Sequence, residues 1–311
     1  MRSVIDLIGN TALVELSRVG AGLSVPIFAK CEHLNPGGSI KDRIAKAIVD
    51  DAEATGQLRP GMTLVEATAG NTGVGLAIVA ALRGYSLVCV MPEKMSLDKR
   101  LALASMGARV VVTANAPPDS ADNFRQVASR LARENDWFAT DQFRNPANIK
   151  VHEETTALEI LEQTGEKIGA FVAGAGTGGT ITGVGRKLKS RLATVRIVLA
   201  DPVGSALADW VETGVLGPDG PYAVEGIGGS LPPENLHRDV VDEAERVSDE
   251  ESFAMVKRLV REEGLLVGGS SGTNVVAAIR VAGRSGLTGP VVTVLPDSWD
   301  RYRAKPWMQG W

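Results

Sequence analysis

A lysine at the start of a predicted helix is the residue of this chain best placed for covalent chemistry. Lys41 follows the segment NPGGSI (35–40), where two glycines allow a tight turn and Ser39 is a favoured helix N-cap. Apolar residues then recur at helical spacing over 40–48, which indicates a buried face. The positive end of the helix dipole disfavours an ammonium charge, so Lys41 would lose its proton readily, as an amine nucleophile must. The alternative is a solvated lysine near a helix start.

Two turns of small residues have the composition of anion sites. The first, EATAGNTGVG (66–75), lies between a predicted strand and a predicted helix, where open backbone N–H groups and Asn71 suit a carboxylate. The second, GAGTGGT (174–180), adds the hydroxyls of Thr177 and Thr180 and suits a phosphate without any basic side chain. Ordinary capped turns are the alternative for both segments.

The second turn also has a different interpretation. Gly174, Gly176 and Gly179 match the GxGxxG pattern of dinucleotide-binding loops, and Asp201 follows at the end of the next predicted strand. Taken alone, this weak pattern would indicate an enzyme that uses NAD. A fourth segment, GGSSGT (268–273), opens a helix predicted to run through 278. A hydroxyl fixed there could bond a ring nitrogen, or it could simply cap the helix.

The elements that would position these segments alternate between strand and helix. The predicted strands span 63–66, 86–91, 109–113, 170–173 and 196–200. The predicted helices span 72–83, 96–106, 120–134, 180–191 and 205–212. This alternation indicates βαβ units in a largely parallel sheet. The stretch 214–233, rich in glycine and proline, predicts a long surface loop near a site.

The composition excludes several classes of protein. With 311 residues, 44% hydrophobic and 23% charged, the chain is long enough for two domains and is not expected to be disordered. A net charge of −4 gives no footprint for nucleic acid. No apolar run reaches membrane-spanning length and the start lacks the features of a signal peptide, so we expect a cytoplasmic protein without a membrane partner.

The cysteines and histidines give no sign of a disulfide frame or a metal site. Cys31 and Cys89 lie in apolar runs and are expected to be buried and reduced. The three histidines, His33, His152 and His237, show no metal-ligand spacing, so no bound metal is expected.

Taken together, the four segments resemble the cysteine synthase and cystathionine β-synthase family, which are fold type II pyridoxal-phosphate enzymes. The resemblance covers nearly the whole chain, in the family's order, through IGNTALVEL, NPGGSIKDR, EATAGNTGVGLA, DQFRNPANIKVHEETT, GAGTGGTITGVG, VEGIG and GGSSGT. An ordered set of this size is a specific signal. It implies an α/β protein with two open, twisted, mainly parallel sheets and flanking helices, as in the tryptophan synthase β-like fold. The cofactor, pyridoxal 5'-phosphate, would lie in the interdomain cleft.

The resemblance also implies a role for each matching residue. Lys41 would hold the cofactor as a Schiff base and, once displaced by the substrate amine, would remove the α-proton as a general base. Asn71 would bond the ring hydroxyl of the cofactor, and Ser270 would face its pyridine nitrogen. The cofactor phosphate would be held by Gly176, Thr177, Gly178, Gly179 and Thr180. The substrate would be bound by Thr68, Ala69, Gly70, Asn71, Thr72 and Gln142, with Gly228 at the entrance.

The domain arrangement implied by the resemblance has a smaller mobile domain over 46–145 and a larger domain made of 1–45 plus 146–311. The smaller domain would close over the site during the reaction. The family also implies a homodimer.

The implied reaction is β-replacement on serine or an O-activated serine, either O-acetylserine or O-phosphoserine. Sulfide or a thiol would be the nucleophile, and L-cysteine or a thioether amino acid the product. A cystathionine β-synthase that acts on serine and homocysteine is the alternative, and DPVGS (201–205) and LPDSWDRY (295–302) resemble that branch. Ala67 and Ala69 stand where the family usually has Pro and Ser, which leaves the amino-acid donor open.

Two other functions compete with this one. A dehydrogenase would use the GxGxxG segment, but it would leave Lys41 and Asn71 without a role. An inactive pyridoxal-phosphate protein, acting as a binding partner or amino-acid sensor, would accommodate Ala69. The presence of Lys41, Asn71 and Ser270 together argues against it.

Overall fold

The computed structural model describes residues 3–68, 70–117 and 120–309. The chain forms two compact units. Unit 1 comprises Met1–Ile8 and Asn35–Asn148, and unit 2 comprises Gly9–Leu34 and Ile149–Trp311. The whole helix that begins at Lys41 therefore belongs to unit 1. The prediction that 46–145 acts as a smaller mobile domain stays a prediction.

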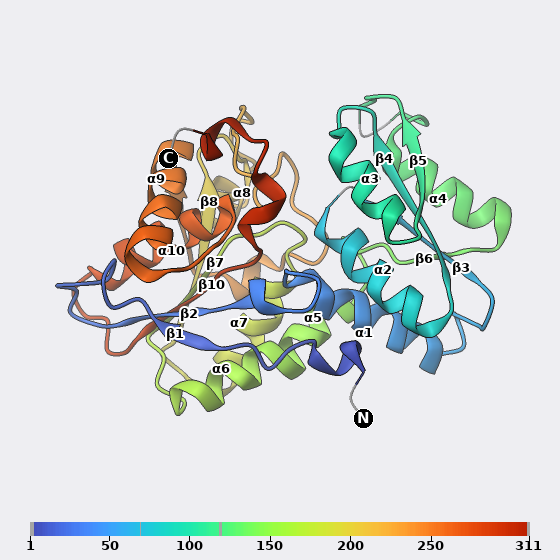
Figure 1. Cartoon of the computed structure of the whole chain (residues 1–311). Helices are drawn as coiled ribbons and strands as arrows, with labels where there is room; N and C mark the ends of the chain where they lie inside the picture. Colours follow the sequence, from blue (N-terminus) through green and yellow to red (C-terminus); the bar gives the residue numbers. More distant parts are fainter. Residues whose placement is uncertain (1–2, 69, 118–119, 310–311) are drawn as a thin grey trace. The chain divides into compact units, whose positions relative to one another are not determined.

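Unit 1 is built on a four-stranded parallel sheet with the strand order β5-β4-β3-β6 (Figure 1). Its strands are β3 (Thr63–Ala67), β4 (Ser86–Pro92), β5 (Arg109–Thr113) and β6 (Phe138–Ala139). Its helices are η1 (Val4–Leu7), α1 (Lys41–Ala54), α2 (Asn71–Arg83), α3 (Leu97–Ser105) and α4 (Phe124–Asn135). Leu64, Cys89 and Met91 pack in one cluster with α1 and α2, whereas the alternate strand residues Val65 and Val88 pack with α4. The sheet is therefore covered on both faces, as parallel sheets are.

Unit 2 is built on a six-stranded sheet with the order β1-β2-β10-β7-β8-β9. Only the edge strand β1 is antiparallel to its neighbour in this order. The strands are β1 (Leu13–Glu15), β2 (Ile27–Lys30), β7 (Ala170–Ala173), β8 (Arg196–Pro202), β9 (Glu243–Val247) and β10 (Val291–Val294). The α-helices are α6 (Ala157–Thr164), α7 (Gly179–Arg191), α8 (Leu207–Thr213), α9 (Asp249–Arg258) and α10 (Gly269–Ala282).

Several shorter helical segments complete the chain. Helix α5 (Ala147–Val151) runs from unit 1 into unit 2 and continues as the π-helix η3 (His152–Thr156). The other segments are η2 (Glu32–Leu34), η4 (Arg238–Val240), the π-helix η5 (Leu259–Glu263), η6 (Trp299–Tyr302) and η7 (Pro306–Met308).

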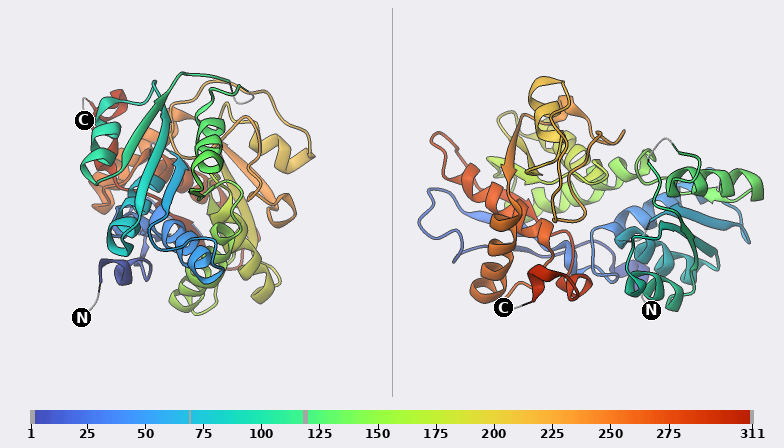
Figure 2. Two further views of the ribbon diagram at one scale, coloured as in Figure 1. Left: turned by 90° about the vertical axis from the view of Figure 1, so that its right-hand side faces the viewer. Right: turned by 90° about the horizontal axis from the view of Figure 1, so that it is seen from above.

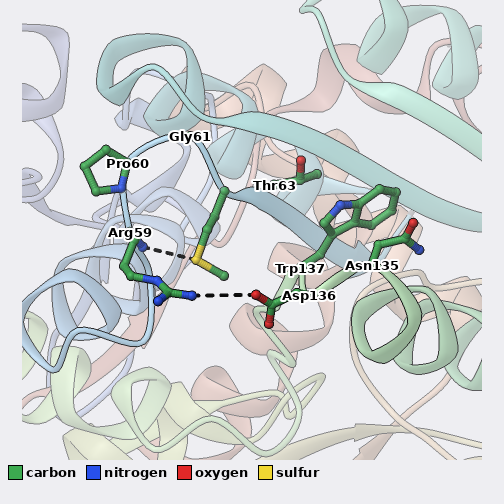
Figure 3. A pocket seen from close by; sticks show the side chains of 8 residues that line it. Arg59, Pro60, Gly61, Thr63, Asn135, Asp136 and Trp137 are labelled. Atoms are coloured by element: carbon green, nitrogen blue, oxygen red, sulfur yellow. Dashed lines mark hydrogen bonds and ion pairs between the residues drawn. The ribbon is translucent and has the colours of Figure 1, made fainter.

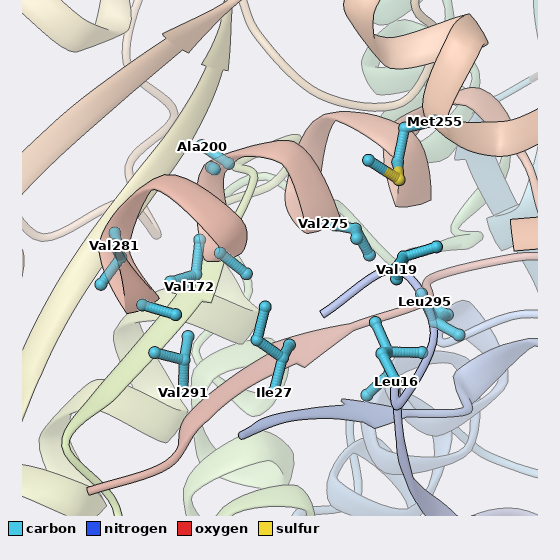
Figure 4. Close-up of a cluster of buried hydrophobic side chains, with 14 of the residues drawn as sticks. Leu16, Val19, Ile27, Val172, Ala200, Met255, Val275, Val281, Val291 and Leu295 are labelled. Atoms are coloured by element: carbon cyan, nitrogen blue, oxygen red, sulfur yellow. The ribbon is translucent and has the colours of Figure 1, made fainter. Parts of the chain in front are cut away.

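The main core of unit 2 lies between its sheet and α10 (Figure 4). Val275 and Val281 of α10 pack against Val172 and Val291, which come from the neighbouring strands β7 and β10. Each large apolar side chain buried in this way contributes roughly 1.5–3 kcal/mol. Helix α7 covers the opposite face, where Gly185 lies against the side chain of Ile197. Figure 2 shows the helices on both sides of the strands from two further directions.

The predicted fold class is confirmed, and the differences from the predicted elements are small. Helix α4 begins at Phe124 rather than 120, because the side chain of Asn123 accepts the N–H of Arg125 at 3.0 Å and caps the helix there. The prediction of Ser39 as an N-cap was wrong: α1 begins at Lys41 after Ile40, and the Ser39 hydroxyl accepts the N–H of Lys41 at 3.2 Å.

Other local predictions can be checked against the structure. Both cysteines are buried and free, as predicted. The stretch 214–233 contains neither helix nor strand, which confirms the predicted loop. No helix among the described residues is long and apolar enough to cross a membrane.

Candidate active site

Lys41 is the first residue of α1, and the start of α1 packs against α2. Gly75 lies one turn into α2, where a Cβ would stand 3.0 Å from the carbonyl oxygen of Lys41 and 3.0 Å from the Cβ of Ala45. Only a residue without a side chain allows the two helices to come this close. Unit 1 therefore brings the lysine near the turn that opens α2.

The turn between β3 and α2 presents backbone N–H groups at a helix start. Thr68 is buried, and its hydroxyl accepts the N–H of Gly70 at 3.2 Å. Gly70 is the N-cap of α2 and Asn71 its first residue, and no side chain in the described part of this turn caps the helix. An anion at such a helix start is stabilised by the N–H groups and by the helix dipole. Ala69, which the sequence analysis placed in the same turn, lies outside the described residues.

A buried hydrogen bond joins this turn to the segment after β6. The Thr72 hydroxyl donates to Oε1 of Gln142 at 2.5 Å, and both residues are buried. The carbonyl of Gln142 accepts from Nδ2 of Asn148 at 2.7 Å. Because the oxygen end of the Gln142 amide faces Thr72, Nε2 is the end suited to donate to a carboxylate. The predicted substrate residues Thr68, Thr72 and Gln142 thus lie together at the carboxyl ends of β3 and β6.

Glu66 holds the segment after β6 in place. Its carboxylate accepts the hydroxyl of Thr140 at 2.5 Å and the N–H of Gln142 at 3.2 Å. The side chain is almost completely buried, and burial raises its pKa. The sequence analysis gave Glu66 no role, because its partners lie more than 70 residues further along the chain.

The glycine-rich loop 174–180 of unit 2 is closely covered by other backbone. A Cβ at Gly176 would overlap the carbonyl oxygen of Gly226, and one at Gly178 would overlap the backbone of Leu236. Gly178 also has a φ of +85°, which side chains rarely adopt. Substitution of Gly178 would therefore distort the loop itself. It is the N-cap of α7, and no side chain among the described residues caps that 13-residue helix.

The buried side chain of His152 contacts the last residue of the same loop. Nε2 of His152 lies 3.2 Å from the hydroxyl of Thr180, and Nδ1 lies 2.9 Å from the hydroxyl of Thr156. His152 is 1% exposed, so the contact with the Thr180 hydroxyl is made by a buried ring. The sequence predicted no such contact for His152.

Ser270 lies in the first turn of α10. Its side chain is buried, and within the described part of the chain its hydroxyl has no hydrogen-bond partner. The hydroxyl itself is accessible, unlike the enclosed and unbonded hydroxyl of the next residue, Ser271, so that of Ser270 can bond a ligand. Gly268 is the N-cap of this helix, and no hydroxyl among the described residues caps it, so the capping alternative does not hold.

Gly228 and Asp201 both lie beside this region of unit 2. The N–H of Gly228 donates to the carbonyl of Ala175 at 2.9 Å, so the VEGIGG turn is bonded to the glycine-rich loop. Asp201 is fully buried at the end of β8, and its carboxylate accepts the N–H of Ala208 at 2.8 Å. Burial raises the pKa of Asp201 to about 6. One carboxylate oxygen of Asp201 is therefore used at the start of α8.

A surface cavity of about 490 Å³ lies in unit 1 (Figure 3). It is lined by Arg59, Pro60, Gly61, Met62, Thr63, Asn135, Asp136 and Trp137. Thr63 begins β3 and Trp137 directly precedes β6, so the cavity is at the amino ends of these strands. Open parallel sheets bind ligands at the carboxyl ends of their strands, which is where Thr68 and Gln142 lie. We therefore assign the cavity no catalytic role.

Comparison with known sequences decides the family. The family described as "Pyridoxal-phosphate dependent enzyme" matches residues 4–297. The chain belongs to this family. Its cofactor is pyridoxal phosphate, and the NAD interpretation of the GxGxxG segment was wrong. A glycine-rich turn before a helix serves any phosphate in the same way, so the pattern alone could not distinguish the two cofactors.

Two curated relatives of this pyridoxal-phosphate dependent enzyme cover almost its whole length. It is 44% identical over 312 residues to cystathionine beta-synthase of Oryctolagus cuniculus. The match covers 99% of this chain and 56% of that protein. It is 42% identical over 315 residues to cystathionine beta-synthase of Apis mellifera, with 100% of this chain and 62% of that protein covered. The chain therefore spans about three fifths of the length of these relatives.

Two solved structures are similar along their whole length. O-ureido-L-serine synthase has a TM-score of 0.92 and 36% identity, with 100% of this chain and 96% of that chain covered. The O-acetylserine dependent cystathionine beta-synthase from Helicobacter pylori has a TM-score of 0.89 and 36% identity, with 98% of each chain covered.

The residues of unit 2 fit pyridoxal phosphate. The start of α7 offers uncapped backbone N–H groups and the hydroxyls of Thr177 and Thr180, which are donors for a phosphate. The unbonded hydroxyl of Ser270 is suited to a neutral ring nitrogen. The start of α7 follows β7, and α10 is bonded through Asn274, one turn beyond Ser270, to Gly174 after β7 and to Val294 at the end of β10.

Proposed function

We propose that this pyridoxal-phosphate dependent enzyme catalyses β-replacement on serine or an O-activated serine. The observation that carries the proposal is the packing of α1 against α2 at Gly75, which puts the backbone of Lys41 next to the helix that opens with Asn71 and Thr72. An amine and a carboxylate-binding turn are what an enzyme needs to act on the α-carbon of an amino acid.

The chain's residues would divide the work as follows. Lys41 holds the cofactor covalently, Asn71 bonds its ring hydroxyl, and Ser270 bonds its ring nitrogen. The loop Gly176–Thr180 binds the phosphate. The carboxylate of the amino acid is bound by Thr68, Ala69, Gly70, Asn71, Thr72 and Gln142, and Gly228 lines the entrance.

The proton transfers would belong to Lys41. When bound, pyridoxal phosphate supplies the electron sink that makes the α-proton acidic and lets the β-substituent leave. Nζ of Lys41, which would hold the cofactor, would also take the α-proton of the substrate and later return it. Gln142 and the start of α2 would meanwhile hold the substrate carboxylate, so that the Cα–H bond is presented in one orientation. Ser270 is neutral, and a neutral partner leaves the ring nitrogen unprotonated, which favours elimination of the β-substituent.

The nucleophile and the donor are the open parts of this proposal. Sulfide would give L-cysteine, and a thiol would give a thioether amino acid. The relatives named cystathionine beta-synthase favour homocysteine as the thiol. The name of the Helicobacter pylori structure favours O-acetylserine as a donor alongside serine.

A product assay tests the proposed reaction. The purified holoenzyme is incubated with serine, O-acetylserine or O-phosphoserine, each combined with sulfide or homocysteine, and the products are identified by mass spectrometry. We expect at least one pair to give cysteine or cystathionine. Formation of neither product from any pair would contradict β-replacement with these nucleophiles.

The family resemblance further predicts a cytoplasmic homodimer. Sedimentation velocity at several protein concentrations measures the oligomeric state directly, with a monomer as the contradicting result.

A further inference from the structure

Asn274 lies in α10, one helical turn beyond Ser270, and both ends of its amide are hydrogen-bonded. The side chain is 1% exposed. Its Oδ1 accepts the N–H of Gly174 at 2.8 Å, and its Nδ2 donates to the carbonyl of Val294 at 2.9 Å. These partners fix the orientation of the amide, since a reversed amide would set donor against donor and acceptor against acceptor.

Gly174 directly follows β7, and Val294 is the last residue of the neighbouring strand β10, so both lie where the pairing of these strands ends. In the parallel register of β7 and β10, the N–H of Ala170 donates to the carbonyl of Pro290. In a parallel ladder, the N–H groups of one strand donate at every second residue. Continued from Ala170 and Pro290, the series would join the N–H of Gly174 to the carbonyl of Val294. The amide of Asn274 instead stands between these two groups and bonds both of them. The inserted side chain therefore keeps the strands apart at their carboxyl ends.

Gly174 is also the first residue of the glycine-rich loop that would bind the cofactor phosphate. Asn274 thus connects the loop directly to the helix that carries Ser270. The pyridine nitrogen and the phosphate of the cofactor are joined by a short covalent frame, so their binding groups must stand at a matching separation. A small displacement of one group costs binding at the other.

We propose that Asn274 is a positioning residue that fixes the loop 174–180 relative to Ser270. The groups that would bind the phosphate and the pyridine nitrogen then stand at the separation that the cofactor requires. The proposal rests on the roles proposed above for the loop and for Ser270. Loss of the amide leaves the N–H of Gly174 and the carbonyl of Val294 without their partner, and the loop start is then free to shift.

A neighbouring residue provides a matched control. Thr273 is equally buried in the same helix, but its hydroxyl lies 2.8 Å from the hydroxyl of Ser252 in α9 rather than against the loop. Thr273→Val removes a buried hydrogen bond without changing the size of the side chain. It reports what a purely structural loss in α10 does to cofactor binding.

The test compares pyridoxal phosphate with pyridoxal, which lacks the phosphate. Cofactor-free wild type, Asn274→Leu and Thr273→Val are titrated with each compound, and the ratio of the two dissociation constants gives the preference for the phosphate. We expect Asn274→Leu to lower this preference by about tenfold, and Thr273→Val to leave it within about twofold, because one well-placed bond to a charged group is worth about one decade. The ³¹P NMR shift of the bound phosphate should change in the first variant only.

An unchanged preference in Asn274→Leu overturns the proposal, as does an equal loss in both variants. Asn274→Ala gives the same test with a smaller side chain if the leucine variant does not fold. No amino-acid donor is present in these titrations. Failure of the proposed β-replacement reaction would therefore appear in the product assay and not here.

Discussion

Ser270 and Ser252 are both buried serines of unit 2, but their hydroxyls differ in bonding. The Ser252 hydroxyl lies 2.8 Å from that of Thr273, whereas the Ser270 hydroxyl has no partner among the residues that the structure describes. A hydroxyl without a partner contributes little to the stability of the protein alone. Its contribution should appear only when a ligand bonds it.

This difference predicts opposite effects for two alanine variants. Ser270→Ala should weaken binding of pyridoxal phosphate about fivefold, since one neutral hydrogen bond is worth about 1 kcal/mol, and should leave the unfolding free energy of the cofactor-free protein nearly unchanged. Ser252→Ala should lower that unfolding free energy by about 1 kcal/mol and leave binding unchanged. Cofactor titration and urea unfolding measure the two quantities. An equal loss of stability in both variants would contradict the assignment of Ser270.

At the scale of elements, the approach of α1 to α2 positions Lys41. A Cβ at Gly75 would lie 3.0–3.1 Å from atoms of Lys41, Asp42 and Ala45, which is tighter than ordinary contact. Gly75→Val should therefore push the helices apart and cost about 1–3 kcal/mol, the usual range for overpacking. It should also reduce turnover. Urea unfolding checks the first effect and the product assay checks the second.

A control for that variant lies in the same helix. Leu82 is 48% exposed, so Leu82→Ala should change stability by about 0.5 kcal/mol or less. If Gly75→Val were as stable and active as Leu82→Ala, close packing at Gly75 would not position the site.

The sequence predicted the elements well because strand–helix alternation and glycine stops are local signals. Strands 109–113 and 170–173 have the predicted bounds, and α2 ends at Arg83 as predicted, with Gly84 as its C-cap. The start of α4 was missed because one capping side chain, that of Asn123, decides it. Asn274 was missed for a different reason: its partner Gly174 lies 100 residues away in the chain. A contact of that separation leaves no periodic pattern in a single sequence.

For the candidate site, too, the sequence predicted some parts and not others. The turns at 66–75 and 174–180 could be found because small residues between a strand and a helix are visible in the sequence. Their supports could not. Glu66 and His152 hold these turns through side-chain bonds to Thr140 and Thr180, and nothing in their local surroundings indicates those partners.

At the scale of the whole molecule, Asp201 makes folding stability depend on pH. Burial raises its pKa to about 6 in the folded protein, above the value of about 3.9 for an unfolded chain. The folded state therefore binds this proton more tightly, and the resulting stabilisation is full below the unfolded pKa and lost as pH rises through the folded pKa.

Asp201→Asn removes this titration and keeps an oxygen that can accept the N–H of Ala208. Wild type should gain about 1.4 kcal/mol from this group between pH 8 and pH 5, and the variant should lack that gain. Urea unfolding of both proteins at the two pH values measures it. The same pH dependence in both proteins would mean that the folded-state pKa of Asp201 is not raised.

The central claim is that this chain is a pyridoxal-phosphate enzyme whose cofactor is carried by Lys41. Borohydride reduction of the holoenzyme fixes the cofactor to the amine that holds it, and peptide mass spectrometry then identifies the labelled residue. We expect the label on the peptide that contains Lys41, and no fixed cofactor in Lys41→Ala. A label on another lysine, such as Lys46 in the same helix, would contradict it.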